Sequence, residues 1–110
     1  MLPKNRRVPR KMFPLLSNGA KTLSNNVFLV RFVSVDKHSS RFCFSVSKKI
    51  SKSAVVRNRL RRIGYKLITK YILEIKPNIV AIFSFRILPK NEEEISKNLD
   101  LILKESKLIK

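Results

Sequence analysis

Residues 45–62, SVSKKISKSAVVRNRLRR, decide the fold because they join a strand pattern to the longest helical pattern in the chain. Upstream, Phe42, Phe44 and Val46 alternate with small or polar residues, as in a strand with one bulky face. Downstream, apolar residues recur every three or four positions, which predicts a helix over residues 53–76 that Pro77 ends. The side chain of Ser53 can cap the start of this helix.

The start of this helix combines the features that bind phosphate. Lys48, Lys49 and Lys52 directly precede it. Free backbone N–H groups and the positive end of the helix dipole add to the charge of these lysines. The three lysines are therefore candidate phosphate-binding residues.

Basic side chains continue along both flanks of the helix. At about 100° per residue, Arg57 lies on one flank of the apolar stripe, whereas Arg59, Arg62 and Lys66 lie on the other. Asn58 points away from the core between them. Guanidinium groups along both edges of a helix docked on a sheet can bind RNA backbones bidentately or stack on bases. Lys66 is included among the candidate RNA-binding residues on this basis.

Two further runs on either side of a polar turn predict strands. Residues 27–35 and 41–47 are rich in β-branched and aromatic residues, and residues 36–40 between them are polar. This pattern is typical of a β-hairpin. A buried strand is expected after the long helix, at residues 79–87, where Pro89 follows and breaks it.

Two more helices are expected, one near each end of the chain. The last begins near Asn91, and the three glutamates that follow suit the positive end of its dipole. The first falls within residues 10–18 and starts near Met12 or Phe13, because Pro14 is tolerated only in a first turn. The resulting order is helix, hairpin or small meander, long helix, strand, helix. This order predicts an α+β sandwich formed by residues 1–110 as a single domain.

The charge of the chain indicates a polyanionic partner. The 110 residues contain 25 Lys and Arg against seven Asp and Glu, which gives a formal net charge of +18. Residues 1–91 hold 21 of the bases and only two of the acids, so the binding surface is expected there. A soluble basic protein without a specific partner is the alternative. No apolar stretch of signal-peptide or membrane-span length follows the basic N-terminus, so a cytoplasmic protein without membrane contact is expected.

Residues that perform hydrolysis in protein enzymes are scarce in this chain. His38 is its only histidine and Cys43 its only cysteine, so neither a His-based triad nor a Cys and His zinc site can form. The carboxylates lie in separate places or at the start of a helix, whereas metal-dependent cleavage usually needs several that converge. We therefore expect no catalytic residue and no metal site in the polypeptide, and a core position for Cys43.

At residues 45–62 the chain resembles the signature of the bacterial ribonuclease P protein family, in which a strand leads through a Ser-Lys-Lys turn into a helix carrying Arg-Asn-Arg. LPKNRR near the N-terminus, the short helix ending near Gly19 and the later elements follow the order of that family. The resemblance implies the order α-β-β-β-α-β-α, with the Arg-Asn-Arg helix in a left-handed crossover between parallel strands. It also assigns RNA-binding roles to Lys48, Lys49, Lys52, Arg57, Asn58, Arg59, Arg61 and Arg62.

The resemblance further implies a function as the protein subunit of ribonuclease P. In that family the partners are a catalytic RNA and precursor tRNA, whose 5′ leader is removed by the RNA together with Mg²⁺. A cleft between sheet and helices holds the single-stranded leader, with Phe13 and Phe28 as candidate cleft aromatics here. An aliphatic residue such as Val30 takes the place of the common cleft tyrosine.

Two other classes of protein are compatible with parts of this pattern. A small basic ribosomal protein would share the charge and the α+β order, but not the Ser-Lys-Lys to Arg-Asn-Arg segment. A protein-only nuclease would need a cluster of metal-binding carboxylates. Co-purification with catalytic RNA or with ribosomal subunits would separate the first two possibilities.

Overall fold

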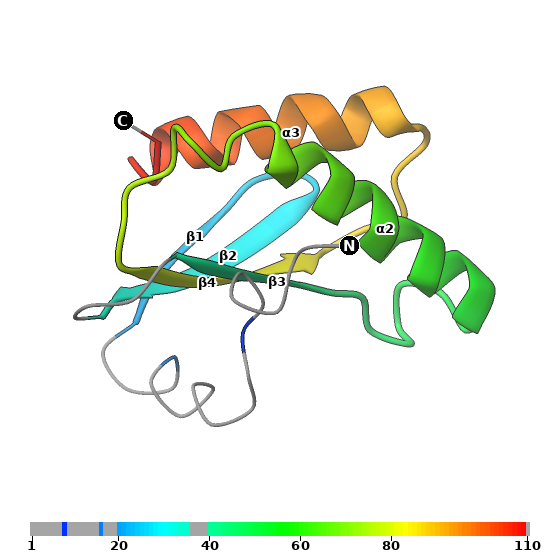
Figure 1. The fold of residues 1–110 in the computed structure, drawn as a ribbon. Coiled ribbons are helices and arrows are strands. Elements are labelled where there is room, and N and C mark those ends of the chain that lie inside the picture. The colour runs from blue at the N-terminus through cyan, green and yellow to red at the C-terminus, as the bar shows by residue number, and fades with distance from the viewer. Residues whose placement is uncertain (1–7, 9–15, 17–19, 36–39, 110) are drawn as a thin grey trace.

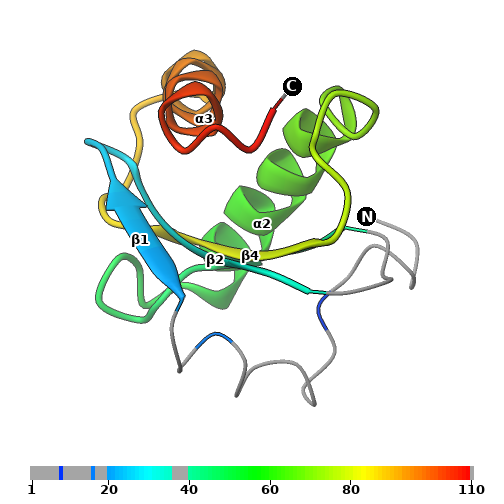
Figure 2. The same cartoon turned by 90° about the vertical axis from the view of Figure 1, so that its left-hand side faces the viewer.

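The computed structural model describes residues 8, 16, 20–35 and 40–109, which form a four-stranded sheet with two helices on one face (Figures 1 and 2). The expected α+β arrangement is thereby confirmed. Of the helix expected at residues 10–18, only Leu16 belongs to the described residues. In chain order the elements are β1 (Lys21–Ser24), β2 (Phe28–Ser34), β3 (Arg41–Ser45), α2 (Ala54–Thr69), β4 (Ile79–Phe85) and α3 (Glu92–Glu105).

The strand order is β1-β2-β4-β3, so the expected pairing of residues 27–35 with residues 41–47 is wrong. β4 lies between β2 and β3, antiparallel to the first and parallel to the second. β4 is largely buried on both faces, and a central position is where such an apolar strand is stable. The hairpin joins β1 and β2 instead. In its turn, Oδ1 of Asn25 accepts hydrogen bonds from the N–H groups of Val27 (3.1 Å) and Phe28 (2.8 Å).

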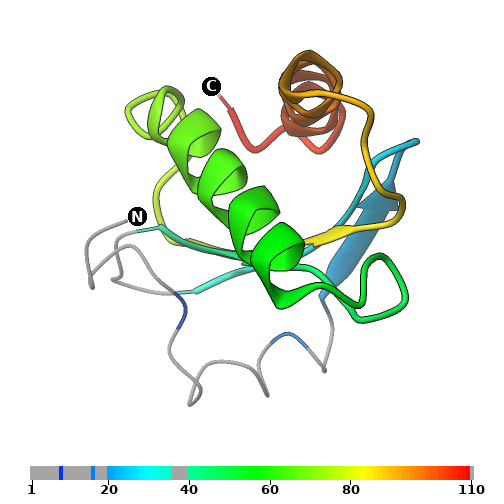
Figure 3. The same ribbon diagram turned by 90° about the vertical axis from the view of Figure 1, so that its right-hand side faces the viewer.

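α2 forms the crossover between the parallel neighbours β3 and β4. Seen from the helix side with these strands pointing upward, β4 lies to the left of β3, so the connection is left-handed (Figures 1 and 3). Nearly all connections of this kind are right-handed. The crossover implied by the resemblance is thus present, and it carries the first turns of α2 out past the end of β3.

Aromatic rings fill the space between the sheet and the helices. Phe28, Phe44 and Phe83 are almost completely buried, and Phe44 stacks on Phe83 at a centroid distance of 5.0 Å. Tyr65 of α2 meets Phe44 edge-on at 5.2 Å. A Cβ atom on Gly64 would lie 2.6 Å from Cδ1 of Phe44. α2 can therefore approach β3 this closely only because residue 64 has no side chain.

α2 ends at Thr69, earlier than the predicted residue 76. The hydroxyl of Thr69 donates to the carbonyl of Tyr65 at 2.7 Å, and the chain continues in tight turns such as the bond from Tyr71 N–H to the Ile68 carbonyl. Ile75 then pairs with Ile109 near the C-terminus. This long-range pairing changes the chain direction, although the apolar spacing continues past Thr69.

The second face of the sheet has a smaller apolar cluster. Val80 is completely buried there, Leu16 is nearly so, and Val8, Val33 and Ile82 pack against them. β4 therefore contributes to a core on each face of the sheet. No helix within the described ranges is long and apolar enough to cross a membrane.

Candidate nucleic-acid interface

The loop between β3 and α2 presents three exposed lysines, Lys48, Lys49 and Lys52. The loop has a defined shape: the N–H of Ile50 donates to the carbonyl of Ser47 at 3.1 Å. Oγ of Ser53 accepts from the N–H of Val56 at 3.3 Å, so Ser53 caps α2 as expected. The first turn of α2 contains no acidic residue that would offset the positive end of the helix dipole.

Arg57 links α2 back to this loop. Its Nη1 donates to the carbonyls of Ser51 (2.9 Å) and Lys52 (3.0 Å), and its side chain is half-buried. One nitrogen of the guanidinium group therefore holds the backbone that carries the lysines. The other donors remain available for phosphate, because a guanidinium group has five N–H donors.

A hollow of about 290 Å³ lies on the β3 side of α2, lined by Asn58, Arg61, Arg62 and Tyr65. Arg61 donates from Nη1 to Oδ1 of Asn58. The prediction that Arg62 shares a flank with Arg59 and Lys66 is wrong. The buried face of α2 is centred on Leu60, Gly64, Leu67 and Ile68, which rotates Arg62 toward Asn58.

Tyr65 connects this hollow to the edge of the sheet. Its hydroxyl accepts a hydrogen bond from the N–H of Phe44 at 3.2 Å, which satisfies an outward-facing donor of the edge strand β3. Burial raises the pKa of Tyr65 above its ordinary value of 10.0. The hydroxyl therefore keeps its proton at neutral pH.

On its other flank α2 faces α3. Arg59 lines a narrow crevice of about 140 Å³, together with residues of the segment that leads into α3. Nζ of Lys66 lies 3.1 Å from Oε1 of Glu92, and both side chains are exposed. Lys66 thus has an acidic partner on α3, which lowers the net positive charge at this end of the candidate surface.

Of the two candidate cleft aromatics, the structure describes only Phe28, which is not found at an open surface. Phe28 is completely buried and packs against Phe83 and Phe85, so its assignment to a leader cleft is corrected to a core residue. Val30, which shares its face, is also completely buried. β2 is apolar on both faces, and only the assembled sheet shows that these residues point toward the helices. Phe13 lies outside the described residues.

The face of the sheet opposite α2 and α3 presents different residues. Leu29, Arg31 and Val33 of β2 point to this face, where Arg31 pairs in register with Thr22 and Ile82. Arg31 and Ser45 are exposed and Leu29 is half-buried. Arg31 was not among the residues predicted to bind RNA. In the sequence, Arg31 differs from its neighbours as the single basic residue within an otherwise largely apolar strand.

Groups that could hold a metal ion are sparse. Within the described part of the chain, no three His, Cys, Asp or Glu side chains come together. The carboxylates there are mainly those of α3, whereas His38 lies outside the described residues. Cys43 is half-buried on the open face of β3 rather than in the core, and burial raises the pKa of its thiol above 9.0.

Comparisons with known proteins give one consistent result. The family model for Ribonuclease P matches residues 2–107. The ribonuclease P protein component of Mycoplasma mycoides is 30% identical over 109 residues, which cover 94% of this chain and 99% of the relative. The component from Prochlorococcus marinus is 28% identical and covers 96% of this chain and 97% of its own length.

Solved structures show the same fold. The RNase P protein of Staphylococcus aureus superposes with a TM-score of 0.84 at 23% identity, covering 96% of this chain and 98% of that structure. The RNase P protein of Thermotoga maritima gives a TM-score of 0.79 at 23% identity, covering 90% of this chain and 96% of its own.

Proposed function

The chain belongs to the ribonuclease P protein family, and on that premise we propose that the loop 47–53 and the outer face of α2 form its contact with the ribonuclease P RNA. As a member of the family, the protein is a subunit of the ribonucleoprotein endoribonuclease that processes precursor tRNA. The observation that carries the proposal is the concentration of exposed basic side chains at the start of α2. The contact residues are Lys48, Lys49, Lys52, Arg57, Asn58, Arg59, Arg61 and Arg62, with Lys66 at the margin beside Glu92.

The chemistry of this surface suits an RNA backbone. The lysines of the loop act as point charges, and the arginines along α2 can engage two phosphate oxygens or stack on a base. The hollow between Asn58, Arg62 and Tyr65 adds an amide and a phenol, which can recognise a base edge or a 2′-hydroxyl group. The surface therefore combines charge with groups that distinguish RNA from a generic polyanion.

We place the 5′ leader of precursor tRNA on the opposite face of the sheet. Arg31, Ser45 and Ser84 point to this face, and half-buried Leu29 gives it an apolar patch. Apolar contacts with a positive charge among them are typical of single-strand binding. Phe28 has no part in this contact because it is buried on the helix side.

In this proposal the RNA performs the chemical step, and the Mg²⁺ ions that assist it are held mainly by that RNA. A bound Mg²⁺ ion would stabilise charge at the phosphate that is cleaved and activate the attacking water. The described residues of the chain do not fit a dedicated Mg²⁺ site, because no three potential ligands converge. The protein contributes positive charge and positions the two RNA molecules. No reported match favours the ribosomal alternative.

Reconstitution with the catalytic RNA of the same organism tests the proposal. Precursor tRNA cleavage is measured at low Mg²⁺ with the RNA alone, with the protein alone and with both. We expect cleavage to require the RNA and to accelerate on addition of the protein. Cleavage by RNA-free protein that survives ribonuclease treatment of the preparation would contradict the assignment of the chemistry to RNA.

Two variants test the two surfaces separately. Arg61→Ala/Arg62→Ala is expected to weaken binding of the catalytic RNA, and Arg31→Ala to weaken binding of precursor tRNA with a leader but not of mature tRNA. Lys97→Gln, an exposed position on α3, provides the control. If Arg31→Ala affected both tRNAs equally, the leader would not lie on this face.

A further inference from the structure

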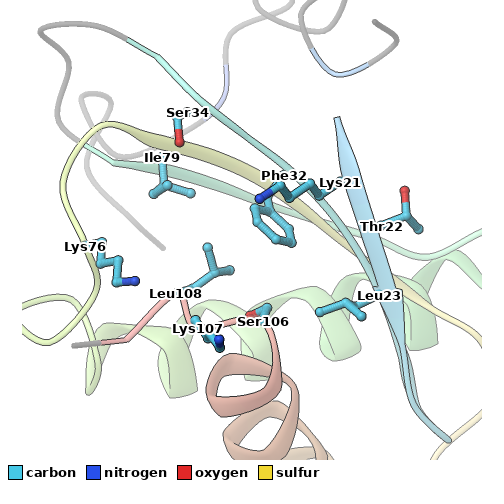
Figure 4. Close-up of a pocket in the computed structure, with 10 residues that line it drawn as sticks. All are labelled: Lys21, Thr22, Leu23, Phe32, Ser34, Lys76, Ile79, Ser106, Lys107 and Leu108. Atoms are coloured by element: carbon cyan, nitrogen blue, oxygen red, sulfur yellow. The ribbon is translucent and has the colours of Figure 1, made fainter. Parts of the chain in front are cut away.

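A cavity of about 570 Å³ lies at the end of the sheet where β4 begins, away from the loop 47–53 (Figure 4). Its apolar part is formed by Leu23, Phe32, Ile79 and Leu108, which come from β1, β2, β4 and the segment after α3. Lys21, Lys76 and Lys107 stand around this apolar part, and Figure 4 shows the amino groups of Lys21 and Lys76 turned toward it. Thr22, Ser34 and Ser106 add hydroxyl groups.

The wall of this cavity is held by pairing between distant parts of the chain. The N–H of Lys76 donates to the carbonyl of Leu108 at 2.7 Å, and Ile75 pairs with Ile109 beside it. Lys107 adopts a left-handed conformation with a φ of 60°. Glycine or asparagine would occupy that conformation with less strain. The lysine there places a third positive charge beside the cavity despite this cost.

Among the described residues, no acidic side chain pairs with the lysines of the cavity. None of its ten lining residues is acidic. Within the described ranges the ion pairs involve Lys66 and Lys104, and not the three lysines of the cavity. Three ammonium groups around one apolar concavity repel one another. Binding of an anion would relieve that repulsion.

We propose that this cavity binds one unstacked nucleotide, with its base against Leu23 and the small exposed part of Phe32 and its phosphate among the three lysines. A base needs an apolar or aromatic surface and a phosphate needs cations, and here the two lie side by side. The volume falls within the usual range for small-ligand sites, about 300–1,000 Å³. The cavity shares no residue with the α2 surface, so the inference goes beyond the proposed function. The nucleotide can belong to an RNA strand or be free.

NMR titration of the isolated full-length protein tests the inference and distinguishes the two sources. The probes are uridine 5′-monophosphate, uridine and a six-residue single-stranded RNA. Shifts at the amides of Phe32, Ile79 and Leu108 with the monophosphate would indicate a site for free nucleotides. The same shifts with the RNA alone would indicate a nucleotide within a strand. Both results support the inference, and uridine is expected to bind more weakly than its monophosphate.

A double variant removes two of the charges. In Lys21→Gln/Lys107→Asn, asparagine keeps the left-handed backbone at position 107, and Lys70→Gln/Lys97→Gln removes the same charge elsewhere. We expect the first double variant to weaken binding of the probe that shifts the cavity amides by about tenfold or more, because charged hydrogen bonds to that probe are lost. The control double variant should change this affinity by less than about twofold. Melting temperatures verify folding of both variants.

Equal weakening in both variants would overturn the inference, because the effect would then be non-specific charge. It would also be overturned if neither nucleotide probe shifted the cavity amides, or if an oligoglutamate peptide shifted them instead. None of these results would bear on RNA binding by α2, because the experiment contains no catalytic RNA.

Discussion

At the scale of single residues, one glycine and one arginine connect the core to the candidate RNA surface. Gly64 allows α2 to lie against Phe44, and Arg57 ties the first turn of α2 to the loop that carries the lysines. Both effects depend on atoms a few ångströms apart. Both residues can therefore be tested by substitutions that leave the charge pattern elsewhere unchanged.

Gly64→Ala is expected to destabilise the protein. Alanine favours a helix over glycine by about 1 kcal/mol, but its Cβ would meet the Phe44 ring at 2.6 Å. That ring is held between Phe83 and Tyr65, so it cannot move away freely. Overpacking of this kind costs about 1–3 kcal/mol, and urea unfolding measures the net change. A more stable variant would show that α2 can shift away from β3.

Arg57→Ala is expected to act on both the loop and the RNA. It removes the bonds to the Ser51 and Lys52 carbonyls, so amide hydrogen exchange in residues 48–53 should accelerate, while global stability falls by about 1 kcal/mol or less. Arg62→Ala is the matched control, because Arg62 is exposed and is expected to contact RNA alone. Both should weaken RNA binding. Unchanged exchange in Arg57→Ala would show that the loop keeps its shape without this arginine.

At the scale of elements, the contact between α2 and α3 is polar at both ends. Lys66 pairs with Glu92 near the start of α3. Beyond the end of α2, the hydroxyl of Tyr71 donates to Oδ1 of Asp100 at 3.1 Å, and Nζ of Lys104 lies 2.9 Å from Oδ2. The apolar residues of α3 lie between these polar contacts: Ile95, Leu99, Ile102 and Leu103 are almost completely buried.

The interactions of Asp100 with Lys104 and Tyr71 should stabilise the protein less at acid pH. The hydrogen bond from Lys104 and, less strongly, that from Tyr71 hold the pKa of Asp100 below its ordinary value of 3.8. Because the folded-state pKa is the lower one, the contribution is present above about pH 4 and is lost as pH falls through the folded-state pKa. Asp100→Asn should cost at most about 1 kcal/mol at pH 6 and progressively less as the pH falls through the folded-state pKa. A pH-independent difference in urea unfolding would exclude this origin.

At the scale of the whole molecule, charge dominates the interaction with RNA. The net charge is +18, and most bases lie before residue 92. The basic residues of the loop 47–53 and the first turns of α2 lie beyond the end of β3, and the three lysines of the cavity lie at the opposite end of the sheet (Figure 4). A protein with this distribution can contact RNA over more than one surface.

Affinity for the catalytic RNA should therefore fall steeply with salt. If six phosphates are neutralised, the affinity should drop about a thousandfold or more between 50 and 200 mM salt. Filter binding over this range gives the slope, and Arg62→Ala should reduce its magnitude by about one unit. A nearly flat response in the parent protein would contradict an electrostatic contact.

The sequence by itself determined the elements that depend on local pattern. The period of apolar residues, the capping by Ser53 and the glutamates that follow Asn91 are local signals, and the helix starts they predicted are confirmed. The spacing of residues 45–62 identified the family, because its sequence of strand, basic turn and Arg-Asn-Arg helix is specific. The net charge indicated a polyanionic partner independently of any fold.

Only the tertiary structure decided how these elements combine. β4 separates β2 from β3 because its residues are apolar on both faces, a long-range preference that a hairpin pattern cannot express. Phe28 and Arg31 lie on opposite faces of β2 because sheet assembly chose which face the helices cover. The cavity lined by Lys21, Lys76 and Lys107 joins segments far apart in the chain. Contacts of this kind leave no periodic trace in sequence, because they form only when the chain closes on itself.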